Sequence, residues 1–87
     1  MRAIITVIGK DTVGILAKTS GVVAKVNGNV VEVTQTVLQD IFTMIMLIEI
    51  DKMTVTIDEL KKMLCTELDT MEIHVIHEDI FNSMHRI

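Results

Sequence analysis

The chain has 87 residues, of which 49% are hydrophobic and 23% charged, with a formal net charge of −4. This composition is that of a globular protein with a single domain over residues 1–87, and a chain this short gains from association with other copies. We therefore expect a homo-oligomer. An acidic chain with only two aromatic residues lacks the cationic surface and the stacking rings of nucleic-acid-binding modules, so no direct nucleic-acid binding is expected.

The same composition argues against membrane insertion and against export. The longest compact apolar run, residues 44–48, is far too short to span a bilayer, and the chain opens with a strand pattern instead of a signal peptide. Its one cysteine, Cys65, cannot form an internal disulfide and has no Cys-x-x-Cys partner. These features predict a cytoplasmic protein in which Cys65 is a half-buried structural residue.

The first two elements are a strand and a helix. Residues 3–8 are β-branched and almost wholly apolar, which is typical of a central strand, and Gly9 follows them. From Val13 onward, helical spacing places Leu16, Thr19, Val23 and Val26 on the inward face of a helix. Asp11 or Thr12 would cap its start, and Asn27-Gly28 would stop it.

Two strands with a short link come next. Residues 30–39 alternate, with Val31, Val33 and Val37 on one face and polar residues on the other, as in an edge strand with one wet face. Residues 42–50 are mostly apolar and predict a second central strand. The polar link between them is so short that it implies an antiparallel hairpin.

The last part of the core is a helix and a strand. Thr56 and Glu59 fit a capping box, so a helix begins near Ile57 and ends before Met71. Its inward stripe is Ile57, Leu60, Met63 or Leu64, and Leu68. Residues 72–77 alternate like a second edge strand.

The order strand, helix, strand, strand, helix, strand predicts a ferredoxin-like α+β fold, βαββαβ, with a four-stranded antiparallel sheet in the order 4-1-3-2 and both helices on one face. The core covers about residues 1–77, and a short helical tail, residues 78–87, follows. The other sheet face would display Ile45 and Leu47. We expect a partner subunit to cover it, helped by apolar residues at helical spacing in the tail, namely Ile80, Phe81, Met84 and Ile87.

The junction between the first strand and the first helix is the candidate site. Glycine lets a ligand approach the main chain closely, and a helix start offers unpaired N–H groups and partial positive charge. In the functional interpretation the amides of Gly14, Ile15 and Leu16 hold a carboxylate while Asp11 receives an ammonium, a combination that suits a free amino acid. In the structural alternative Gly14 only packs the helix close to the sheet and Asp11 only caps it.

These features together resemble the ACT domain, a small ligand-sensing module usually attached to enzymes and regulators of amino-acid metabolism. The resemblance covers nearly the whole chain and is carried by Gly9-x-Asp11-x-x-Gly14-Ile15-Leu16, by Asn29-Val30-Val31 and by the order of elements. The tail, residues 78–87, further resembles stand-alone prokaryotic ACT-domain proteins. Related modules occur in tandem in proteins similar to the glycine-cleavage-system repressor.

The resemblance implies amino-acid binding at the interface of a homodimer. The implied ligand-binding residues come from the loop and from the start of the second strand: Asp11, Thr12, Val13, Gly14, Ile15, Leu16, Asn29 and Val30. In ACT dimers the segment that matches Asn29-Val30 often faces the loop of the partner. Asn29 can equally be a plain turn residue after Gly28.

Other chemistry finds little support in the sequence. His74 and His77 are three residues apart on a predicted strand and point to opposite faces, so they are poorly placed to share a metal ion. Ser20 and Ser83 have no glycine elbow or base at a recognisable spacing. We therefore expect a non-catalytic sensing module without a cofactor or metal. The alternative is a protein–protein assembly module that binds no small molecule.

Overall fold

The computed structural model describes residues 1–84 and confirms the predicted order of elements. Ile87 and the two residues before it lie outside the described part. The elements are β1 (Arg2–Lys10), α1 (Ile15–Lys25), β2 (Asn29–Leu38), β3 (Ile41–Glu49), α2 (Ile57–Glu67), β4 (Glu72–His77) and α3 (Glu78–Met84).

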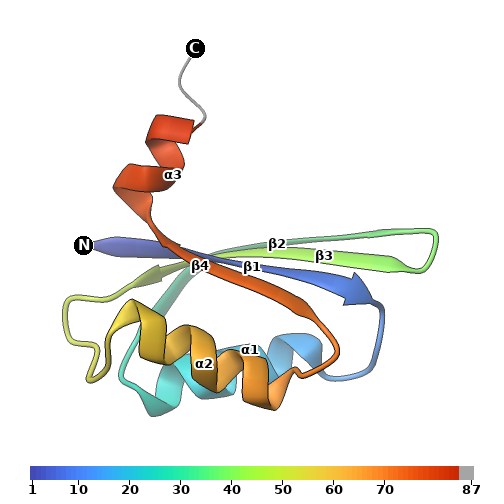
Figure 1. The fold of residues 1–87 in the computed structure, drawn as a ribbon, viewed down its shortest axis with the longest axis horizontal. Helices are drawn as coiled ribbons and strands as arrows, with labels where there is room; N and C mark the ends of the chain where they lie inside the picture. Colours follow the sequence, from blue (N-terminus) through green and yellow to red (C-terminus); the bar gives the residue numbers. More distant parts are fainter. Residues whose placement is uncertain (85–87) are drawn as a thin grey trace.

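The four strands form one sheet in the order β2-β3-β1-β4, with every neighbouring pair antiparallel (Figure 1). This is the predicted order, with the apolar strands β1 and β3 inside and the more polar β2 and β4 at the edges. The predicted hairpin is also confirmed, because β2 and β3 are joined by a turn at Gln39 and Asp40. Gln39 has a positive φ of 54°, which this tight turn requires.

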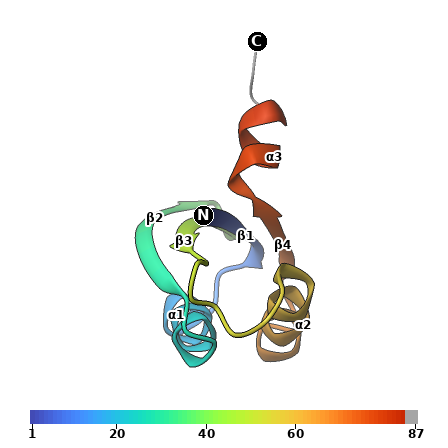
Figure 2. The same ribbon diagram turned by 90° about the vertical axis from the view of Figure 1, so that its left-hand side faces the viewer.

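Both long helices cover the same face of the sheet, and the core lies between them and the two central strands (Figure 2). On that face β1 contributes Ile5 and Val7, and β3 contributes Met44 and Met46, all of them fully buried. From α2, Leu60 and Leu64 are fully buried against them.

The start of α1 differs from the prediction. Neither Asp11 nor Thr12 caps the helix. Its N-cap is Gly14, which has φ +86° and makes no side-chain hydrogen bond, because a left-handed turn brings the chain from β1 into the helix. The helix therefore begins at Ile15, and Ile15 is buried while Leu16 is 39% exposed. The predicted inward position of Leu16 was wrong. Thr19, Val23 and Val26 are buried as expected.

The edge strand β2 also differs from the prediction of one dry face. Val33 is partly buried, and the other nine residues of the strand are exposed. A bulge between Val30 and Glu32 shifts the register, so Val31 has no partner on β3. Apolar and polar residues do alternate along β2, but the helices do not fully cover the apolar side of this edge strand, so its valines stay largely exposed.

The α2 helix begins as predicted. The Thr56 hydroxyl accepts a hydrogen bond from the Glu59 amide at 3.1 Å, and the Glu59 carboxylate accepts one from the Thr56 amide at 3.3 Å, which confirms the capping box. The helix ends at Glu67, before Met71. Leu60, Leu64 and Leu68 are buried, so the predicted stripe faces the sheet.

The short helix α3 lies on the opposite side of the sheet from α1 and α2 (Figure 2). It contacts β1 and β4 at the end of the sheet where the N-terminus lies. We call the sheet face on this side the open face. It carries Ile4, Thr6 and Ile8 of β1 and Ile41, Thr43, Ile45 and Leu47 of β3.

Candidate functional site

The predicted ligand loop, residues 11–14, joins the end of β1 to α1 and is attached to the neighbouring hairpin. The Asp11 amide donates a hydrogen bond of 3.0 Å to the carbonyl oxygen of Asp40 in the β2–β3 turn. Gly14 follows with its φ of +86°, and a Cβ placed on it would meet no atom within 4 Å. Glycine is therefore needed here for its conformation, and the space beside it is open.

The side chains of the loop face solvent, whereas Ile15, the first residue of the helix, is only 3% exposed. Asp11 and Thr12 are exposed, and Val13 is 98% exposed. The Gly14 carbonyl accepts the first hydrogen bond of the helix, from the Lys18 amide at 2.9 Å. The amides of Gly14, Ile15 and Leu16 make no hydrogen bond of ordinary geometry to another described residue outside the helix ladder. Chemically, this arrangement can bind a carboxylate.

The second part of the predicted site, Asn29 and Val30, lies far from this loop in one protomer. Asn29 pairs with Glu49, which pairs with Arg2 at the start of β1, whereas the loop follows Lys10 at its end. A strand of nine residues separates them, or about 30 Å at 3.3 Å per residue. One protomer alone does not bring the two groups of residues together.

Asn29 occupies a polar hollow of its own. Its side-chain amide donates a hydrogen bond of 2.8 Å to the Glu49 carboxylate. The hollow measures about 430 Å³ and is also lined by Asn27, Asp51 and Lys52. Asn27 donates to the Lys52 carbonyl at 2.9 Å and has a positive φ of 64°, so it ends the helix as predicted.

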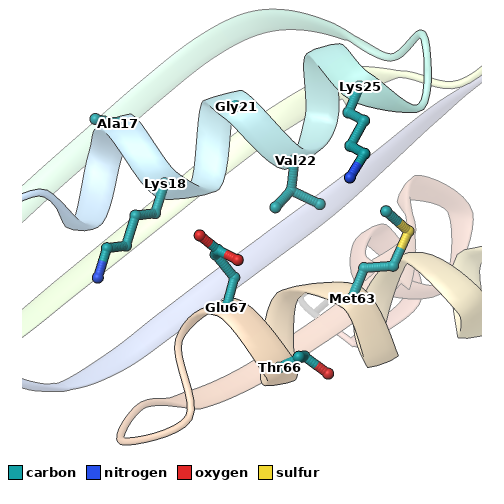
Figure 3. A pocket seen from close by; sticks show the side chains of 8 residues that line it. All are labelled: Ala17, Lys18, Gly21, Val22, Lys25, Met63, Thr66 and Glu67. Carbon is teal, nitrogen blue, oxygen red and sulfur yellow. The ribbon is translucent and has the colours of Figure 1, made fainter.

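Sequence reasoning missed a larger hollow of about 590 Å³ between the two long helices (Figure 3). Lys18 and Lys25 of α1 and Glu67 of α2 border it, with Val22 and Met63 between them. Gly21 also borders it, and a Cβ there would meet nothing within 4 Å, so the space beside Gly21 is open. A glycine in mid-helix was the available sequence signal. None of the predicted site residues lines this groove.

The predictions for the histidines and for the cysteine have different outcomes. His74 pairs with Thr6 on the open face and His77 with Ala3 on the helix-covered face, so their opposite directions are confirmed. Within the described residues, 1–84, there is no group of three or more His, Cys, Asp or Glu that could hold a metal ion. Cys65 is exposed, not half-buried, because it follows the inward-facing Leu64 on the outer side of α2.

One ion pair fastens α3 to β1. An Arg2 guanidinium nitrogen donates to Glu78 at 2.8 Å, and a second nitrogen contacts the other carboxylate oxygen. The hydrogen bond from Arg2 lowers the pKa of Glu78, and the same bond raises the pKa of Arg2. The pair stands at the end of the sheet opposite the glycine loop.

Comparison with known proteins places this architecture in a family. The ACT domain family profile matches residues 2–77. A UPF0237 protein of Clostridium perfringens is 46% identical over 89 residues, which cover 100% of both chains. An ACT domain protein from Streptococcus pneumoniae has 34% identity and a TM-score of 0.78, with 98% of each chain covered.

A more distant solved structure is that of a putative glycine cleavage system transcriptional repressor. At 20% identity and a TM-score of 0.70, over 85% of this chain and 43% of the other, it shows a common fold. The fold, the glycine loop and these matches define a small ACT-type regulatory module. The chain belongs to the ACT domain family, and its full-length relatives are the small UPF0237 proteins. None of the helices in the described part of the chain is long and apolar enough to cross a membrane.

Proposed function

We propose that this protein is a non-catalytic, cytoplasmic regulatory module that binds a free amino acid between the two subunits of a homodimer. The observation that carries the proposal is that the amides of Gly14, Ile15 and Leu16, which follow the exposed Asp11, make no hydrogen bond of ordinary geometry within residues 1–84 outside the helix ladder. Amides and a helix start favour a carboxylate, and a nearby aspartate favours an ammonium. A free amino acid carries both groups.

The edge strand β2 supports a particular dimer. It is long, exposed on both faces and free of proline and lysine, the residues that commonly protect an edge from pairing. In an antiparallel pair of β2 strands about a twofold axis, Asn29 of one copy lies beside Leu38 of the other. Leu38 adjoins the hairpin turn to which the partner's loop is attached through Asp11 and Asp40. The two separated parts of the site then meet.

This geometry also accounts for the exposed apolar residues near the edge. Val30, Val31, Val37 and Leu38 are 37%, 46%, 54% and 72% exposed in the single chain. Pairing of β2 strands would remove much of that surface from water, and the side chains near the loop would line a partly apolar pocket. In the proposed dimer, ligand binding would stabilise the pairing and so change which surfaces the module presents to other proteins.

Calorimetry across the twenty common amino acids, compared between Gly14→Asp and Gly14→Asn, tests the binding site. Both variants place a similar side chain at the same positive φ, which Asp and Asn tolerate better than most residues. Only aspartate adds a negative charge beside the amides. We expect saturable binding with one ligand per protomer, lost in the aspartate variant and retained in the asparagine variant. No saturable heat with any amino acid would refute the proposal.

The dimer is tested by adding two lysines to the edge strand, Gln35→Lys with Val37→Lys, at exposed positions on the helix-covered side of the sheet. The control, Thr66→Lys with Thr70→Lys, adds the same charge at exposed positions outside the sheet. Sedimentation should give the first variant half the mass of the wild type and leave the mass of the second unchanged, and only the second should bind the ligand. A first variant of half mass that binds with unchanged affinity would contradict the shared pocket.

A further inference from the structure

The α3 helix projects from the open face, and little of the rest of the chain covers the helix (Figures 1 and 2). Its first residue, Glu78, is held by the ion pair with Arg2. The Asp79 amide donates a hydrogen bond of 3.1 Å to His77 Nδ1. Ile80 is nevertheless 55% exposed. A helix of seven residues is far below the roughly 12 residues at which isolated helices become even marginally stable in water. We therefore expect another surface to cover the apolar side of α3 and to stabilise the helix.

The other end of the open face carries a matching surface. Leu38 pairs with Ile41 across the hairpin, and the two are 72% and 55% exposed. Lys10 pairs with Ile41 on the other side, is exposed, and has no ion-pair partner among residues 1–84. At one end of the face α3 thus carries the exposed Ile80 and the exposed Asp79, whose carboxylate lies 3.6 Å from His77 Nδ1, and the opposite end has a lysine and two exposed apolar residues.

We propose that a second copy of this chain covers the open face, with the two sheets stacked face to face and each α3 helix clasping the far end of the other sheet. Ile80 of one copy packs on Leu38 and Ile41 of the other, and Asp79 faces Lys10. The twofold axis makes each contact occur twice. This interface uses the sheet face, so it adds to the edge pairing of β2 and would turn an edge-paired dimer into a tetramer.

The dimensions agree with this arrangement. The strands have 9, 10, 9 and 6 residues, so the face is about 30 by 19 Å at its widest, and two stacked faces bury at most about 1,100 Å² before the arms are counted. Two α3 arms bring this total into the range of about 1,200–2,000 Å² that stable interfaces need. Stacked sheets lie about 10 Å apart, and seven helical residues span about 10 Å, so each arm reaches across the gap.

The end of the sheet on which the partner's α3 helix would dock lies next to the glycine loop. Lys10 immediately precedes Asp11, and Ile41 immediately follows Asp40, whose carbonyl holds the loop. An arm docked there would contact the same segment that carries the glycine loop. Assembly through α3 and occupancy of the loop would therefore influence each other.

Analytical ultracentrifugation of four variants and one control tests the interface. Ile80→Glu, Asp79→Lys and Lys10→Glu should each halve the mass of the assembly, and the double variant Asp79→Lys with Lys10→Glu should restore it. Asp69→Lys, an exposed acid on the helix-covered side of the molecule, is the control and should leave the mass unchanged. Circular dichroism confirms that each variant is folded.

Two outcomes would overturn the inference. One is an unchanged mass in Ile80→Glu and Asp79→Lys across a dilution series. The other is a double variant that stays at half mass although both single variants dissociate, because the charges would then not face each other. If only the Gln35 and Val37 lysines of the edge strand halve the mass, this interface is rejected and the edge-paired dimer stands.

Discussion

The Asp11 amide donates a hydrogen bond of 3.0 Å to the Asp40 carbonyl oxygen, which ties the loop after β1 to the turn between β2 and β3. The loop is therefore anchored at its start by the hairpin and at its end by α1. Among residues 1–84, the amides of Gly14, Ile15 and Leu16 that follow make no hydrogen bond of ordinary geometry outside the helix ladder. Rigid attachment of this kind reduces the ordering cost of binding, because the donors are already in place.

Gly14 should be intolerant of alanine although space is available. Its φ is +86° and a Cβ at this position would meet no atom within 4 Å, so the cost of Gly14→Ala comes from backbone strain, about 1–2 kcal/mol. Gly21→Ala is the matched control, since Gly21 also has free space but lies within α1, where alanine is favoured by about 0.5–1 kcal/mol. Urea unfolding should shift in opposite directions for the two variants. Equal shifts would contradict the strain.

The capping box of α2 should contribute measurably to stability. Thr56→Ala removes the acceptor of the Glu59 amide and should lower the free energy of unfolding by about 1 kcal/mol. Thr66→Ala is the control, because the Thr66 hydroxyl only donates to the Lys62 carbonyl within the same helix. Its effect should be close to zero. A Thr56 variant as stable as the Thr66 variant would show that the cap contributes nothing.

Leu64 and Leu16 should differ sharply in their tolerance of truncation. Leu64 is fully buried between α2 and the sheet, so Leu64→Ala should cost about 2–5 kcal/mol through lost burial and a residual cavity. Leu16 is 39% exposed on the outer side of α1, and Leu16→Ala should cost clearly less. Chemical denaturation followed by circular dichroism measures both. A larger loss at Leu16 would disagree with the described start of α1.

The attachment of α3 should depend on pH through Glu78. Because Arg2 lowers the pKa of Glu78 in the folded protein, the ion pair stabilises α3 above the ordinary glutamate value of about 4.3, and this contribution is lost as the pH falls below it. Methyl NMR signals of Ile80 should shift over this acidic range in the wild type. In Glu78→Gln that transition should be absent. The same transition in both proteins would assign it to another group.

Cys65 should react as an exposed thiol. It lies on the outer side of α2, so a thiol reagent should modify it fully in the folded protein, without added denaturant. Mass spectrometry before and after unfolding measures the extent. Protection of Cys65 until the protein unfolds would mean that a further subunit covers this side of α2.

The sequence predicted the fold well because its patterns were local and strong. The apolar β1 and β3 lie in the middle of the sheet along their whole length, and the more polar β4 lies at its edge. Thr56 and Glu59 mark a helix start because their side chains form the capping box. The start of α1 was misread because Asp11 and Thr12 are good caps in general, and only the left-handed turn at Gly14 makes the helix begin later. The β2 bulge at Val31 has no clear sequence signal.

The candidate site was harder to predict than the fold. The loop residues are neighbours in sequence, so their proximity follows from the chain itself. Asn29 and Val30 come from the far end of the sheet, and no pattern within one chain decides what faces them. Cys65 was misplaced because a cysteine has no strong preference on an amphipathic helix, and its neighbour Leu64 takes the inward position.

The separation of Asn29 from the glycine loop along β1 has a consequence for physiology. In the proposed dimer the pocket is divided between two polypeptides and exists only when both are present, so its filling would depend on how much of the protein the cell has made as well as on the metabolite. At low protein abundance few pockets would form, so the metabolite would find few sites to bind. At high abundance a modest rise in metabolite would suffice, and the level of gene expression would set the threshold of the sensor.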